Sequence, residues 1–220
     1  MNIATKNLAT KAERIYSEIE HRADMIVHVL GALFAVNATA WLVAHISGSG
    51  VLVASVLVYC MGLLAMIFAS AAYNLWPHGP SKQLLRRIDH SAIFFMIAAT
   101  YTPFAANRLG GLAGPLILSV VWLAATGGII LKVAFPRRFE TASLALYLVT
   151  GWMIVTVIRP LEHSLAAVDF WLLAGGGLVY SAGVVFYVIE RIPFHKAIWH
   201  GFVLVAAVLH FSAIALEFSR

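Results

Sequence analysis

Seven apolar blocks, each about as long as a lipid bilayer is thick, dominate this sequence of 220 residues. A hydrocarbon core of about 30 Å is crossed by roughly 20 helical residues, so each block predicts one membrane-spanning helix. Helices are expected because lipid offers no hydrogen-bond partner to a backbone amide, and the alternating pattern of a membrane barrel is absent. The predicted spans are residues 24–46, 51–75, 88–107, 111–134, 141–160, 168–189 and 197–218.

The composition argues against a soluble globular domain. Hydrophobic residues make up 61% of the chain and charged residues 11%, and the mean hydropathy is +0.88. One soluble core of this size could not bury so much apolar surface. The sequence therefore predicts an all-α fold, a seven-transmembrane helix bundle over residues 24–220, preceded by a short amphipathic cytoplasmic segment, residues 1–23.

The basic residues predict the orientation of this bundle. Twelve of the fifteen Lys and Arg residues fall in the N-terminal segment and in the loops after the second, fourth and sixth spans. The other three, Arg108, Arg159 and Arg220, fall on the opposite side. Because basic loops stay on the cytoplasmic side, we expect a cytoplasmic N-terminus and a C-terminus outside. The net charge of +5 comes from these short loops, so membrane lipids are the expected partners, and not nucleic acid.

Polar residues gather at the expected cytoplasmic ends of three spans. Ser70 and Asn74 lie four residues apart at the end of the second span, and Asp89 begins the third. Lys196 and His200 lie four apart at the start of the seventh. Residues at this spacing share one helix face, and polar groups at this depth are costly unless they face the bundle interior and find partners. We therefore predict one polar cluster of these five residues, with an ordinary interfacial polar layer as the alternative.

Four stretches carry a family resemblance: "RADMIVHVLG" (22–31), "LLRRIDHSAIFFMIAATYTPF" (84–104), "GGLVYSAGVVFY" (176–187) and "KAIWHGFVLVAAVLHF" (196–211). Together they resemble the hemolysin III family, the bacterial branch of the progestin and adipoQ receptor superfamily. The resemblance covers nearly the whole chain. It implies a seven-helix bundle with a cytoplasmic N-terminus, placed in the bacterial inner membrane.

The resemblance also implies a zinc site within the polar cluster. Family members typically carry Ser-x-x-x-His at the end of the second span, Asp at the start of the third, and His-x-x-x-His at the start of the seventh, and three histidines hold the ion. Ser70, Asp89 and His200 match this pattern. Asn74 and Lys196 stand where the other two ligand histidines belong.

These two departures argue against a metal cofactor. An asparagine amide is a poor zinc ligand, and a protonated ammonium is not a ligand at all. We therefore expect no zinc, and we expect the Lys196 ammonium to take the place of the cation, paired with Asp89 and hydrogen-bonded to Asn74. Whether such a buried ion pair adds net stability depends on its desolvation cost.

A zinc site built from other donors is the alternative. Asp89 and His200 could be joined by His90, which follows Asp89, by His195 or by His78 in the loop after the second span. In a regular helix His195 does not share a face with His200, because one residue is about 100° of rotation from the position of Lys196.

Three functions stay open at this point. The first is a non-enzymatic membrane protein that acts in membrane or lipid homeostasis, with its zinc site replaced by polar side chains. The second is a zinc-dependent hydrolase that cleaves a membrane lipid amide such as ceramide by metal-activated water, as the superfamily's chemistry implies. The third, pore formation or cytolysis, is suggested by the family name. The sequence favours the first, because two ligand positions are lost, and no catalytic residue is assigned.

Overall fold

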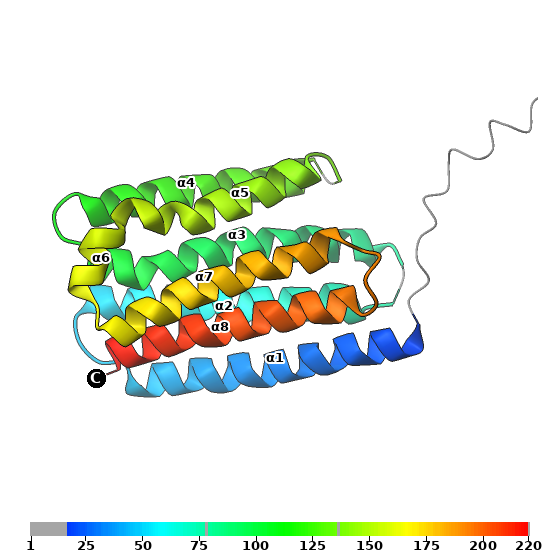
Figure 1. Ribbon diagram of the computed structural model, residues 1–220, viewed down its shortest axis with the longest axis horizontal. Helices are drawn as coiled ribbons and strands as arrows, with labels where there is room; N and C mark the ends of the chain where they lie inside the picture. Colours follow the sequence, from blue (N-terminus) through cyan, green and yellow to red (C-terminus); the bar gives the residue numbers. More distant parts are fainter. Residues whose placement is uncertain (1–16, 78, 136, 220) are drawn as a thin grey trace, which may run out of the picture.

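The chain forms a bundle of long, roughly parallel and antiparallel helices in the computed structural model, which describes residues 17–219 except 78 and 136 (Figure 1). The described residues contain no β-strand, so the all-α prediction is confirmed for them. The helices are α1 (Glu18–His45), α2 (Gly50–Leu75), α3 (Ser81–Asn107), α4 (Ala113–Ala134), α5 (Glu140–Trp152), the 3₁₀ helix η2 (Met153–Val157), α6 (Ile158–Ser164), α7 (Ala167–Val188) and α8 (His195–Phe218).

Six helical segments are long and apolar enough to cross a membrane: α1, α2, α4, the combined segment Glu140–Ser164, α7 and α8. The third predicted span lies in α3, which has 27 residues but more polar side chains, and its crossing stays a prediction. The outward faces are apolar, since Leu123 is 73% exposed and Trp171 70%. Lipid accommodates such side chains without the cost that water imposes. The chain is therefore a multi-pass membrane protein.

The first helix begins earlier than the expected boundary at residue 24. Ser17 is its N-cap, and its hydroxyl accepts a hydrogen bond from the Glu20 backbone N–H at 3.2 Å. The Glu20 carboxylate accepts in turn from the Ser17 backbone N–H at 3.1 Å, which completes a capping box. Residues 18–23 thus belong to α1, and the rest of the predicted cytoplasmic segment, residues 1–16, lies outside the described residues.

The fifth predicted span is broken, although the sequence predicts one helix over residues 141–160. Its break at η2 lies beside Tyr101 of α3, whose hydroxyl donates to the carbonyl oxygens of Thr150 and Gly151 at 3.0 and 2.7 Å. The same hydroxyl accepts from the Ile154 backbone N–H at 2.8 Å. Backbone groups released by the break are thus satisfied from a neighbouring helix, as a membrane interior requires.

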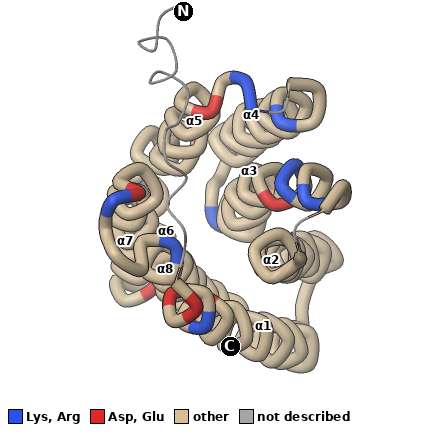
Figure 2. The backbone as a smooth tube through the Cα atoms, turned by 90° about the vertical axis from the view of Figure 1, so that its right-hand side faces the viewer, with Lys and Arg blue, Asp and Glu red and all other residues tan. Residues whose placement is uncertain are grey.

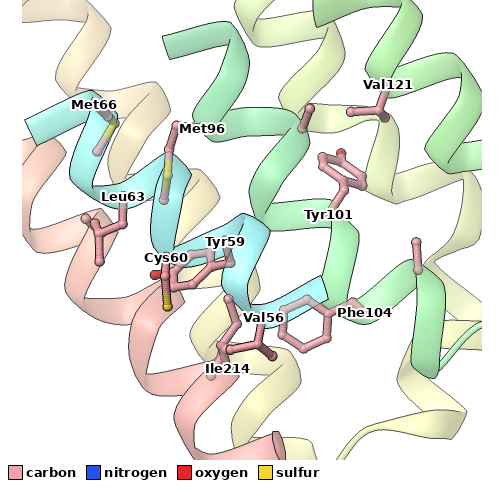
Figure 3. Packing of buried hydrophobic residues seen from close by; sticks show 14 of the residues in the cluster. Val56, Tyr59, Cys60, Leu63, Met66, Met96, Tyr101, Phe104, Val121 and Ile214 are labelled. Atoms are coloured by element: carbon pink, nitrogen blue, oxygen red, sulfur yellow. The ribbon is translucent and has the colours of Figure 1, made fainter. Parts of the chain in front are cut away.

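The core lies where α2 packs against α3 and α8. Figure 3 shows Val56, Tyr59 and Leu63 of α2 in one apolar cluster with Met96 of α3 and Ile214 of α8. These five residues are at most 3% exposed. α8 also packs against α7 and α1, and α3 against α4.

Two glycines allow neighbouring helices to pack closely. A Cβ atom at Gly128 of α4 would lie 2.3 Å from the Phe94 ring of α3, and one at Gly176 of α7 would lie 2.2 Å from the His210 ring of α8. Gly127 and Gly177, their neighbours in the sequence, have no atom within 4 Å of the corresponding position. Close packing of these helix pairs therefore depends on Gly128 and Gly176, and not on the glycines beside them.

One end of the bundle collects the first turns of α1, α3, α5 and α8 and the last turns of α2, α4 and α7, and we call it the cluster end (Figure 1). Figure 2 looks onto this end, where Lys and Arg residues lie on α3, on α4 and in the turn between α4 and α5. The residues of the predicted polar cluster also lie at the cluster end.

Candidate functional site

The centre of the site is a buried acid–histidine pair between α1 and α8. The Nδ1 atom of His200 lies 2.6 Å from the Asp24 carboxylate, and the Asp24 and His200 side chains are only 7% and 11% exposed. A carboxylate at this distance accepts a hydrogen bond, so Nδ1 carries the hydrogen. The pair joins α1 to α8 through two residues that are 176 positions apart in the sequence.

Asn74 of α2 occupies the other side of the His200 ring. Its amide nitrogen lies 3.5 Å from His200 Nε2 and also donates to the Ser70 carbonyl oxygen at 3.0 Å. Because Nδ1 of a neutral imidazole carries the hydrogen here, Nε2 has a lone pair and accepts from the amide. Both ring nitrogens of His200 are thus engaged by side chains, one from α1 and one from α2.

His28 completes the cluster one helical turn after Asp24. The two residues share a face of α1, and His28 Nε2 lies 3.6 Å from Asp24 Oδ2, beyond a normal hydrogen bond. The His28 ring packs against the His200 ring with centroids 4.4 Å apart. His28 is 5% exposed, and its Nε2 atom has no hydrogen-bond partner among the described residues. It is the polar group of the cluster with unused bonding capacity.

Backbone contacts at the cluster end hold these side chains in register. Glu20, about one turn before Asp24 on α1, accepts a hydrogen bond from the Phe194 backbone N–H at 2.8 Å. Phe194 is the N-cap of α8 and has a left-handed backbone with φ of 59°, so this bond fixes where α8 starts. The depth of His200 relative to Asp24 follows from that start.

Lys82 fixes the end of α2 in the same way. Its ammonium donates to the carbonyl oxygens of Tyr73, Asn74 and Trp76, the last at 2.8 Å, and so satisfies the exposed C-terminus of that helix. Partial burial, with the charge of Lys196 as a second cause, lowers the pKa of the Lys82 ammonium. Asn74 is thereby held at the level of His200.

Asp89 lies beside the cluster on α3. Its carboxylate interacts electrostatically with Ser70, His28 and Arg86. Asp89 is 9% exposed. Lys196 is half-buried at the start of α8 and interacts electrostatically with Asp24 and Glu190. The expected pairing of Lys196 with Asp89 stays a prediction.

Comparison with known proteins identifies the family. The family model described as "Haemolysin-III related" matches residues 17–211. The chain is 40% identical to Hemolysin-3 homolog of Bacillus subtilis (strain 168), over 84% of this chain and 88% of the relative. It is 38% identical to Hemolysin-3 of Bacillus cereus, over 89% and 90% of the two chains.

The chain belongs to the hemolysin III family. A more distant relative, the human monocyte to macrophage differentiation factor, is 34% identical over 71% of this chain and 67% of its own. The similarity to that protein supports the placement of the hemolysin III family within the progestin and adipoQ receptor superfamily.

The zinc ligand set that the resemblance implied does not fit this hemolysin III chain. Asn74 lies against His200 Nε2 with an amide nitrogen, which offers a donor hydrogen and no lone pair. Lys196, at the other lost ligand position, brings a positive charge. Of the three ligand histidines that the family pattern requires, only His200 is therefore present in this chain.

A different set of metal-type donors is present among the residues described here. Asp24, His28 and His200 each offer one ligand atom, and these atoms lie within 4.8 Å of one another. Two imidazoles and a carboxylate are donors that zinc accepts. Binding there would require a metal to replace the proton between His200 Nδ1 and Asp24.

Other predicted metal donors lie apart from this set. His195 is buried, and its Nδ1 lies 3.2 Å from the Phe186 carbonyl oxygen of α7. His90 lies near Glu140, with Nδ1 4.0 Å from a carboxylate oxygen. Neither these two nor Asp89 joins the set of Asp24, His28 and His200, and His78 lies outside the described residues.

Sequence reasoning missed Asp24 and His28 as members of the site. The stretch "RADMIVH" carries the same spacing of four that drew attention to Ser70 and Asn74. The spacing of four at the start of the first span was the signal that could have found both.

Proposed function

We propose that this hemolysin III protein is a non-enzymatic membrane protein that binds a membrane lipid inside its helix bundle and acts in lipid homeostasis. In the proposal it spans the bacterial inner membrane seven times, with its N-terminus in the cytoplasm and its C-terminus outside. The distribution of charge supports this orientation. Nine Lys and Arg residues among those described lie at the cluster end, against Arg108 and Arg159 at the other.

A large apolar cavity is the observation that carries the proposal. It has a volume of about 220 Å³ and lies between α3, α5, α7 and α8. Apolar side chains form most of its wall, among them Ile97 of α3, Leu148 of α5 and Leu173 of α7. An apolar cavity of about 150 Å³ already holds benzene, so this one has room for a segment of an acyl chain.

The closed hydrogen bonding of His200 supports a function without hydrolysis. A hydrolytic zinc needs three protein ligands and an open position for water. Here Asp24 and Asn74 engage both ring nitrogens of His200.

Filling the cavity tests the proposal. Gly177 of α7 lines it, and no atom lies within 4 Å of where its Cβ would be, so Gly177→Leu projects into the cavity without a backbone clash. Gly127→Leu is the matched control, because Gly127 is exposed on α4, is equally open and does not line the cavity. We expect purified wild type and Gly127→Leu to retain about one lipid per chain by native mass spectrometry, and Gly177→Leu to lose it. Equal lipid retention by both variants would overturn the proposal.

A second function, metal-dependent cleavage of a lipid amide, is favoured by the donor set of Asp24, His28 and His200. Its test is the release of fatty acid from ceramide by protein incubated with zinc. If the protein only binds lipid, the wild type should release no more fatty acid than Asp24→Asn does. Release that depends on zinc and on Asp24 would favour hydrolysis instead.

A further inference from the structure

A basic pocket lies at the cluster end where α3, α4 and α5 meet, and we call it the basic corner. Four of its lining residues are cationic, one from α4, one from the turn before α5 and two from α3: Arg86, Arg87, Lys132 and Arg137. Glu140 at the start of α5 is the one acidic residue in its wall. The corner therefore carries an excess of positive charge.

The single carboxylate does not neutralise this excess. Glu140 is shared by two cations, with Oε2 2.8 Å from Lys132 Nζ and Oε1 3.0 Å from Arg86 Nη2. Lys132 is 3% exposed, so its charge is held inside the protein. The Nε atom of Arg87 is buried and has no hydrogen-bond partner among the described residues. Arginine in this state offers donors to an anion.

The basic corner adjoins the apolar cavity. His90, Lys132 and Glu140 line both spaces. A ligand that filled both would need an anionic head and an apolar chain. A lipid whose head group is charged has this chemistry, and the corner lies at the end of the bundle where membrane head groups would lie under the proposed orientation.

We propose that the lipid bound by this protein is anionic, with its phosphate or carboxylate head in the basic corner and one acyl chain in the cavity. The inference rests on the proposed function and adds the class of lipid to it. Arg137 is exposed at the rim and supplies charge to the head, while the more buried Lys132 and Arg86 position Glu140 and the wall.

Two adjacent arginines allow a matched test. Arg137 lines the basic corner, whereas Arg138 does not and lies over the Phe139 ring. Arg137→Gln removes one charge from the corner, Arg138→Gln removes one charge beside it, and Arg137→Lys restores the charge. Both positions are on an exposed turn, and folding is checked by the thermal midpoint of each of the three variants.

The experiment measures binding of phosphatidylglycerol and phosphatidylethanolamine with identical acyl chains to the purified full chain in detergent. We expect phosphatidylglycerol to bind more tightly, and Arg137→Gln to weaken it by about fivefold, as expected for one basic side chain near an anionic lipid. Arg138→Gln and Arg137→Lys should leave the preference in place. Gly177→Leu should weaken both lipids.

Other results would contradict different parts of the proposal. Equal binding of the two lipids, or equal effects of Arg137→Gln and Arg138→Gln, would overturn the anionic head in the corner and leave the lipid proposal standing. Glycerol phosphate bound as tightly as phosphatidylglycerol would overturn the need for an acyl chain. Binding of neither lipid would overturn the proposed function itself.

Discussion

His200 of α8 and Asp24 of α1 are joined by a 2.6 Å hydrogen bond inside the cluster end. The bond couples the first and last helices of the bundle, and a buried bond to a charged group is worth more than one between neutral groups. Because Nδ1 of His200 carries the hydrogen of this bond, it has no lone pair to offer to a metal ion.

Removing the charge of Asp24 should destabilise the bundle. Asp24→Asn keeps the shape but weakens the bond to His200, and we expect a loss of about 2 kcal/mol in the free energy of unfolding. The measurement is reversible unfolding in detergent micelles. Glu18→Gln is the control, because Glu18 is on the same helix, its side chain is 89% exposed and its pair with Arg22 is screened by water. Similar losses in both variants would contradict a special role for the Asp24–His200 bond.

The partner of Lys196 is tested by two double-mutant cycles. Because Lys196 interacts electrostatically with Asp24, we expect Lys196→Met and Asp24→Asn to be non-additive by about 1 kcal/mol in unfolding free energy. The pairing with Asp89 predicts that Asp89→Ala is destabilising and that adding Lys196→Met recovers part of the loss. Additive effects of Asp89→Ala and Lys196→Met would show that these two side chains do not interact.

Helix packing gives a third prediction. Gly176→Ala places a methyl group against the His210 ring, 2.2 Å from its nearest atom, so α7 and α8 must separate. Overpacking of this kind costs about 1–3 kcal/mol. Gly175→Ala is the control, since its methyl group meets only Leu209 at 3.9 Å. Thermal midpoints that fall equally in the two variants would contradict the close contact at Gly176.

Sequence spacing predicted part of the site. Residues four apart placed Asn74 toward His200, because local helix geometry decides which residues share a face. The partner on α1 could not be predicted in this way, since the contact between Asp24 and His200 depends on which helices become neighbours. The break at η2 was missed for a similar reason: its backbone groups are satisfied by Tyr101, from a different helix.

Restoring the family's ligand histidines should create a zinc site. In Asn74→His with Lys196→His, an imidazole replaces the amide beside His200 Nε2 and the adjacent positive charge is removed. We expect this double variant to bind about one zinc per chain, measured by elemental analysis and by the visible spectrum of its cobalt form. A double variant that binds no more metal than wild type would show that residues 74 and 196 do not face a common centre with His200.

The most direct test is the metal content of the unmodified protein. In our account a proton and the Asn74 amide occupy the two nitrogens of His200, so zinc has no open ligand set. Protein purified without chelator, in detergent and with zinc present during growth, should contain well below one zinc per chain by elemental analysis. One zinc per chain, removed by a chelator and absent from Asp24→Asn, would contradict the account.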